Sequence, residues 1–349
     1  MSIRIFLGGV NITEYVPDKP KITSQKEFGK FTVINSYKVN LLNENDLFTI
    51  GNPNSIIGTN PIGTTFLMQD DASGSWETIF SGELVDGPEQ KDGDASILVP
   101  NFLMRYLNEE TTYSGSGKTA AEIALTILDG VPSKYIDSTS FANVHQTLYN
   151  NSVFLNAVWK EGGNKTIVQA LNDLALFSSG YLYTYRNKIY FKLRSFSNVS
   201  PKSIYTEDDF DNLKRSVKQT KYMWNDYSIE YANTVTKDVD NNSVGLESRN
   251  KYKIISTFTL NGGTGESIEI VDLTSAVWIG ESVINANKEP VDIVKFNIQK
   301  SADKFNLETI FALSKSKWGY DNATVFDVMT IKSDPDKEDL EIIGREVIG

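Results

Sequence analysis

The sequence contains no cysteine and only one histidine, His145. Without cysteine the chain can form neither disulfides nor thiolate metal sites, and it has no cysteine nucleophile. A zinc site would need one imidazole together with carboxylates, and a Ser-His-Asp triad would have to use His145. No nucleophile elbow lies near this residue in the sequence, so we interpret it as an ordinary hydrogen-bonded or solvated histidine.

Arginine and long hydrophobic runs are also scarce. Only seven of the 34 basic residues are arginine, they are scattered, and the net charge is −11. Because arginine is the preferred residue for bidentate phosphate contacts, this composition argues against a surface that grips nucleic acid. No apolar run approaches the roughly 20 residues that cross a bilayer, and the first residues do not form a convincing signal peptide.

The composition is that of a globular protein with a substantial core. The chain has 349 residues, of which 40% are hydrophobic and 11% aromatic, which allows two or three domains. We predict a mainly β fold with an α+β insertion: a β domain over 1–107, the insertion over 108–204 and a second β domain over 205–349. Alternation and turn residues predict strands at 30–42, 64–69, 76–87, 94–102, 221–233, 251–260, 266–273, 291–299, 306–314 and 325–333.

Helical patterns are confined to the insertion and one later segment. We expect helices at 119–129 and 166–177, and a third at 274–286 before Pro290. A tight turn at Arg186-Asn187 predicts a tyrosine-rich hairpin over 181–193. Its tyrosines could form a stacking platform for bases or sugars, but strand alternation explains them as core residues.

Residues 114–120 resemble the second half of a phosphate-binding loop. Gly117, Lys118 and Thr119 match the motif, but its first glycine would fall on Thr112, a β-branched residue that resists positive φ. Thr119 is also followed three residues later by Glu122, which is the pattern of a helix capping box. We therefore predict that these residues begin a helix and bind no nucleotide.

Acidic clusters offer no better site. The string 238–243 starts like a calcium loop but has Ser243 where glycine is needed and Arg249 at the twelfth position. The string 334–339 fails in the same way, and we interpret both as hydrated turns. The cluster at 205–216 is typical of a solvated helix start, and no carboxylate pair stands out for glycoside hydrolysis. We predict no catalytic, cofactor-binding or metal site and no cofactor.

The order of these parts resembles a known family. It is similar to the hub proteins at the tip of the tail tube in tailed bacteriophages, which are related to hubs of contractile injection systems. The stretches that carry this resemblance are 3–16, 76–107, 166–193, 224–231 and 275–298.

The resemblance implies a structural virion protein of the tail, made in the host cytoplasm and without enzymatic activity. Two tube-type β domains of one chain, here 1–105 and 205–349, would lie side by side, so that a homotrimer supplies six of them. Such a hub would join the tail tube or a distal tail protein to spike, fibre or other baseplate proteins. DNA would pass through its lumen without specific binding. Acidic strands facing inward would repel phosphates, and the open alternative is that the net charge serves only to keep the protein soluble.

Three alternatives stay open at this point. A distal tail protein would form a ring of six copies, each with a single tube-type domain. A receptor- or carbohydrate-binding tail module would use the hairpin at 181–193. An enzyme, either a nucleotide hydrolase or a glycosidase, would need one of the sites that the sequence does not supply.

Overall fold

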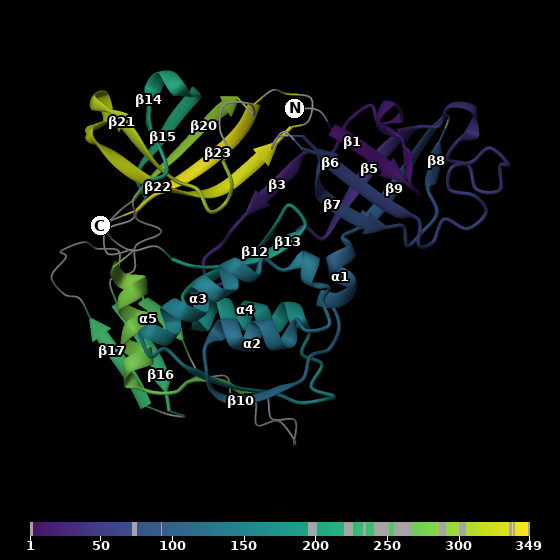
Figure 1. The fold of residues 1–349 in the computed structure, drawn as a ribbon. Helices are drawn as coiled ribbons and strands as arrows, with labels where there is room; N and C mark the ends of the chain where they lie inside the picture. Colours follow the sequence, from purple (N-terminus) through teal and green to yellow (C-terminus); the bar gives the residue numbers. More distant parts are fainter. Residues whose placement is uncertain are drawn as a thin grey trace.

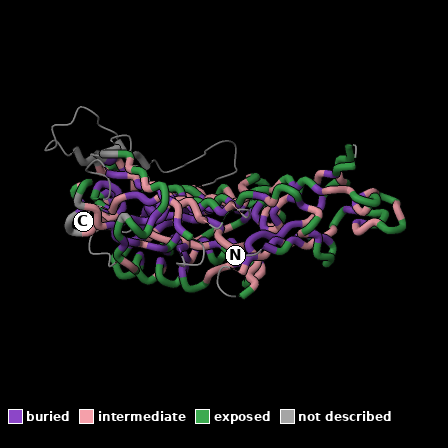
Figure 2. The backbone as a smooth tube through the Cα atoms, turned by 90° about the horizontal axis from the view of Figure 1, so that it is seen from above, coloured by how far each residue is buried: buried purple, intermediate pink, exposed green. Residues whose placement is uncertain are grey.

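The computed structural model describes most of the chain, which is arranged in three packed regions (Figure 1). Seen from above, the molecule is elongated, and buried backbone runs along its length (Figure 2). The described residues are 3–71, 75–91, 93–194, 201–219, 226–232, 235–240, 251–254, 267–285, 291–299, 305–334, 337 and 339–347.

The first β region consists of two small sheets around one core. One sheet has the order β2-β1-β6-β7 and the other the order β5-β9-β8. Alternating residues such as Val39 and Leu41 point inward and are buried with Phe66 and Ile97. The strands of this region are β1 (Ile3–Leu7), β2 (Val10–Asn11), β5 (Ser36–Leu42), β6 (Thr65–Asp70), β7 (Glu77–Glu83), β8 (Glu89–Lys91) and β9 (Asp94–Pro100).

The middle region packs five helices and a mixed sheet around a second core. The sheet has the order β10-β11-β19-β16-β17, and β18 also pairs with β16. The helices are α1 (Phe102–Leu107), α2 (Ala120–Ile127), α3 (Ser138–Asn150), α4 (Ile167–Phe177) and α5 (Leu273–Asn285). The strands are β10 (Tyr113–Lys118), β11 (Leu155–Trp159), β16 (Asp226–Tyr231), β17 (Val235–Asp240), β18 (Lys251–Ile254) and β19 (Ser267–Ile270).

Three of these helices match the predictions. Complete capping boxes at Thr119 and Thr166 begin α2 and α4, and α5 lies where a helix was expected before Pro290. The helix α3 was not predicted, because most of its residues are polar and only Phe141, Val144 and Leu148 form its apolar stripe. Asp137 caps it by accepting a hydrogen bond from the Ser140 N–H at 2.9 Å.

The last β region is a seven-stranded sheet with an aromatic core. Its order is β14-β21-β22-β23-β20-β15, and β3 adds to β22. The predicted helix start at 205–216 is wrong, because Tyr205 and Phe210 turn into the aromatic core and leave only a short 3-10 turn between two strands. The strands are β3 (Ile22–Gln25), β14 (Ile204–Thr206), β15 (Asp211–Gln219), β20 (Val291–Gln299), β21 (Ile310–Lys315), β22 (Tyr320–Ser333) and β23 (Asp339–Glu346).

The overall class, mainly β with an α+β portion, is confirmed. The predicted domain boundary between 204 and 205, however, does not separate the packed regions. The strand β19 pairs with β11, and residues of β16, β19 and α5 lie in the same core as the middle helices. The predicted strand at 30–42 divides near Asn35 into β4 (Phe31–Thr32) and β5, which belong to different sheets. Regions that pack together are therefore not continuous in sequence.

Candidate functional site: the junction of the three regions

The predicted hairpin is the element that touches all three regions. It consists of β12 (Gly180–Tyr185) and β13 (Lys188–Leu193), and β4 pairs with β12 in parallel. Arg186 and Asn187 at its turn have φ of 46° and 61°, the left-handed conformations of a two-residue hairpin turn. Helix α4 leads directly into β12, so the hairpin projects from the middle region (Figure 1).

The tip of the hairpin contacts the first β region. Arg186 forms ion pairs with Glu77 and with Asp70, the latter at 3.4 Å between Nη2 and Oδ2. The Asn187 side-chain amide donates a hydrogen bond of 2.8 Å to the Ser81 hydroxyl. Charge-assisted bonds between separate elements fix their relative position, because they act only when both elements are in place.

The base of the hairpin lies against the last β region. Tyr181 and Tyr183 are 1% and 0% exposed and belong to the aromatic core of that region. Tyr183 stacks on Tyr190 with ring centroids 5.5 Å apart. The reading of these two tyrosines as core residues is confirmed, and a stacking platform that uses them is wrong because no sugar or base can reach them.

A buried charge cluster lies beside this base, and each member comes from a different part of the chain. The Lys26 Nζ donates to the Asp327 Oδ1 at 2.7 Å and to the Leu307 carbonyl at 2.6 Å. The Lys192 Nζ donates to the same Asp327 oxygen at 3.3 Å. The Lys26 side chain is 0% exposed and that of Asp327 is 8% exposed, so this lysine-aspartate pair is removed from water.

Burial and charge act in opposite directions in this cluster. Burial lowers the pKa of Lys26 to about 7, although the charge of Asp327 raises it in part. Burial alone would raise the pKa of Asp327, but the two ammonium groups outweigh it and hold that pKa below its ordinary value. The Lys26–Asp327 pair therefore joins the segment after β3 to β22. Removing the two charges from water is unfavourable, and the attraction between them offsets this cost.

The strand β3 reinforces this tie through the backbone. It leaves the first β region and pairs antiparallel with the end of β22, with Ser24 opposite Ile331. The Lys26 N–H continues the ladder by donating to the Met329 carbonyl at 3.0 Å. The first and last β regions are thus joined by a shared sheet, a buried ion pair and the hairpin.

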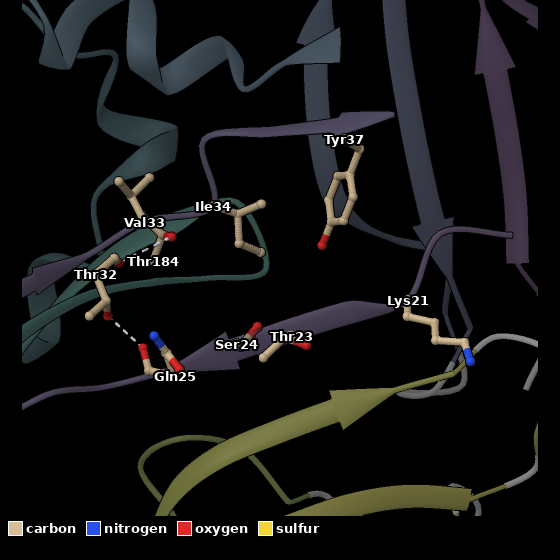
Figure 3. Close-up of a pocket in the computed structure, with 9 residues that line it drawn as sticks. All are labelled: Lys21, Thr23, Ser24, Gln25, Thr32, Val33, Ile34, Tyr37 and Thr184. Atoms are coloured by element: carbon tan, nitrogen blue, oxygen red, sulfur yellow. Dashed lines mark hydrogen bonds between the residues drawn. The ribbon is translucent and has the colours of Figure 1, made fainter. Parts of the chain in front are cut away.

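A cavity of ≈ 300 Å³ lies beside β3. Figure 3 shows hydroxyl and amide side chains from β3, β4 and β12 around it, with the Tyr37 phenol directed toward β3. The Tyr37 oxygen is buried without a hydrogen-bond partner in the described part of the chain, and burial raises its pKa. The cavity is lined by Lys21, Thr23, Ser24, Gln25, Thr32, Val33, Ile34, Tyr37 and Thr184.

Thr119 in the phosphate-loop candidate caps helix α2, as predicted, whereas the strand β10 that precedes it was not predicted. The Gly117 N–H donates to the Asn156 side chain at 2.9 Å, and Lys118 pairs with Glu122 at 3.2 Å. The Thr119 hydroxyl accepts from the Glu122 N–H and lies 3.0 Å from the His145 Nδ1. These groups already have partners, and the prediction of a hydrogen-bonded histidine is confirmed.

The structure describes the two calcium-like strings, 238–243 and 334–339, to different extents. Residues 238–240 end β17, and the rest of that string, with Ser243 and Arg249, lies outside the described residues. Asp334 in the second string pairs with Lys21 at 3.1 Å. Within the described ranges, no group of three or more acidic or histidine side chains could hold a metal ion, and no helix there is long and apolar enough to cross a membrane.

Sequence comparisons and structural comparisons give different results. No family model and no curated protein matches the sequence. Among solved structures, the chain is similar to the 43 kDa tail protein of prophage MuSo2 from Shewanella oneidensis, with a TM-score of 0.57 and 12% identity over 100% of this chain and 98% of that one.

Two further structures resemble it over nearly their whole length. The tail protein from Neisseria meningitidis MC58 has a TM-score of 0.56 at 10% identity and covers 99% of this chain and 96% of its own. The prophage tail protein gp18 from Listeria monocytogenes EGD-e has a TM-score of 0.52 at 9% identity, with 99% and 94% covered. The chain therefore has the fold of phage tail proteins, as its resemblance to the tail-tip and baseplate hub family implied.

Proposed function

We propose that this protein is the hub at the tip of a phage tail tube. In this proposal three copies form a ring, and each contributes its first and last β regions as two neighbouring tube-type units. The ring joins the tail tube or a distal tail protein to spike, fibre or other baseplate proteins, and the virion tail is its location. No catalytic role is proposed.

The observation that carries the proposal is the full-length likeness to three tail proteins, which includes both β regions and the middle region. The junction gives it a physical basis. A ring with six equivalent positions built from three chains requires a fixed spacing between the two units of each chain. The shared strand β3 and the Lys26–Asp327 pair provide such a fixed spacing.

The net charge of −11 suits a channel for DNA. Carboxylates on a lumen repel phosphates, so that DNA passes without being held. In a gel-shift titration at low salt we expect no retardation of double-stranded DNA, and binding that weakens steeply with salt would contradict a non-adhesive channel.

The copy number is the direct test. Multi-angle light scattering of the purified protein, over a wide concentration range, should give a mass three times that of the chain. Six copies would support a distal tail ring instead. A monomer at every concentration, together with no threefold density in electron micrographs of tails that contain the protein, would overturn the hub proposal.

A further inference from the structure

The buried pair of Lys26 and Asp327 places an amine against a carboxyl group. The Lys26 Nζ lies 2.7 Å from the Asp327 Oδ1, so the carboxyl carbon is only one bond further away. The Leu307 carbonyl accepts a second hydrogen bond from the same amine at 2.6 Å and holds the amine in place. Because a fixed geometry removes much of the entropic barrier to a reaction, this arrangement favours a bond between the two groups.

Burial makes the Lys26 amine reactive. Its side chain is 0% exposed, and burial lowers its pKa to about 7, although Asp327 raises it in part. A substantial share of the amine therefore carries no proton at neutral pH, and an unprotonated amine is a nucleophile. A lysine in water stays protonated under the same conditions.

A second lysine can supply the proton that amide formation needs. The oxygen of a carboxylate leaves readily only when it is protonated, so the reaction requires an acid at that oxygen. The Lys192 Nζ donates to the Asp327 Oδ1 at 3.3 Å. Its side chain is 16% exposed, so Lys192 can also exchange protons with solvent.

We propose that Lys26 and Asp327 condense after folding into an amide bond between their side chains. The unprotonated Nζ attacks the Asp327 carboxyl carbon, and the bond from that carbon to Oδ1 breaks. Oδ1 takes one proton from Nζ and one from Lys192 and leaves as water. Lys192 then regains a proton from solvent, and no oxidant or reductant is required.

The protein interior favours the amide over the ion pair. In water both ions are well solvated, whereas inside the protein they have lost this solvation, and a neutral amide removes both charges. The amide keeps one N–H, which can still donate to the Leu307 carbonyl. The carboxyl group starts ionised because its pKa is lowered, so the step is slow and freshly prepared protein still holds the ion pair.

The bond would join distant parts of one chain. Lys26 and Asp327 are 301 positions apart, and the amide would connect the segment after β3 to β22 covalently. The junction between the first and last β regions would then persist even when its hydrogen bonds open. The bond forms within a single chain, so it does not depend on the ring of the proposed function.

An exposed cluster in the last sheet provides a matched comparison. Glu341 also contacts two lysines, Lys295 at 2.6 Å and Lys332 at 2.9 Å. The lysine side chains are 45% and 47% exposed and that of Glu341 is 26% exposed. The distances and charges resemble those of the buried pair, but water solvates these ions. We therefore expect no amide at Glu341.

Mass spectrometry tests the bond directly. The purified natural protein is kept at mildly alkaline pH and sampled over several weeks. We expect the intact mass to fall by one water molecule and a tryptic digest to contain a branched peptide that joins Lys26 to Asp327. The branched peptide is decisive, because a succinimide at an aspartate also loses one water. Absence of this peptide after several weeks would overturn the proposal.

A variant and an unfolded sample complete the test. Lys192→Met should slow formation of the branched peptide at least about tenfold, and an unchanged rate in the folded variant would overturn the role of Lys192. Circular dichroism checks that this variant is folded. The natural protein kept in urea should form no branched peptide, because the fold supplies the proximity. A branched peptide at Glu341 would contradict the requirement for burial.

Discussion

The first and last β regions differ in how far their cores are built from their own residues. The first has a largely aliphatic core, and every buried member of it comes from residues 3–99. The last has an aromatic core that includes Tyr181 and Tyr183 from the hairpin, and its sheet takes β3 from the other end of the chain. The first region can therefore be stable alone, whereas the last needs the rest of the molecule.

The largest expected effect comes from breaking the buried cluster on which the last region depends. Asp327→Asn leaves Lys26 and Lys192 close together without a carboxylate, so we expect the free energy of unfolding to fall by about 3–5 kcal/mol. Urea titration followed by tryptophan fluorescence measures the loss. The matched control in the first β region is Glu89→Gln, which removes an exposed pair with Lys38 and should change nothing measurable.

The pH dependence of the free energy of unfolding tests the buried cluster of the last region in a second way. The pKa of Lys26 is lowered to about 7 by burial, whereas a lysine in the unfolded chain titrates near ~10.4. Between these values the unfolded state binds more protons, so Lys26 makes stability rise with pH from about 7 upward and adds no slope below 7. Relative to Lys26→Met, the natural protein should gain roughly 2–3 kcal/mol between pH 7 and pH 9.

Three groups face Lys26: Asp327, Lys192 and the ring of Tyr181, whose centroid lies 5.4 Å from the Lys26 Nζ. Asp327 is ionised throughout this pH range because its pKa is lowered, and burial raises the pKa of Tyr181. Parallel pH profiles for the natural protein and Lys26→Met would contradict the assignment.

A smaller effect is expected where the hairpin tip meets the first β region. Arg186→Ala removes ion pairs with Asp70 and Glu77, at a site where the arginine side chain is 23% exposed. We expect a loss of about 1.5 kcal/mol. Hydrogen exchange should quicken in β7 and at the hairpin turn but not at the β3–β22 pairing, and uniform quickening would show that the tip does not act locally.

The smallest effect lies outside both β regions. Thr119→Ala removes the hydroxyl of the α2 capping box and should cost about 1 kcal/mol. Lys118→Ala, next to it, should change stability by less than about 0.5 kcal/mol. ATP should not raise the melting temperature of the natural protein or of either variant, and a rise with ATP for the natural protein alone would support a nucleotide site at Lys118.

Local signals were readable in the sequence, and distant pairings were not. The capping boxes of α2 and α4 and the turn at Arg186-Asn187 depend on residues within four positions of each other, so they could be predicted. Lys26 gave no signal, because its partner Asp327 lies 301 positions away. The placement of β16–β19 with the middle helices also depends on tertiary packing, which strand alternation does not encode.

The pairing of β3 with β22 has a consequence for synthesis. Residues 22–25 leave the ribosome early, but the strand that receives them, at residues 330–333, is translated about three hundred residues later. The growing chain must carry an open strand edge until that moment. A product that stops before residue 330 can fold its first β region but lacks the part of β22 that receives β3. Its last sheet is therefore incomplete, and the exposed strand edge is open to pairing with other chains.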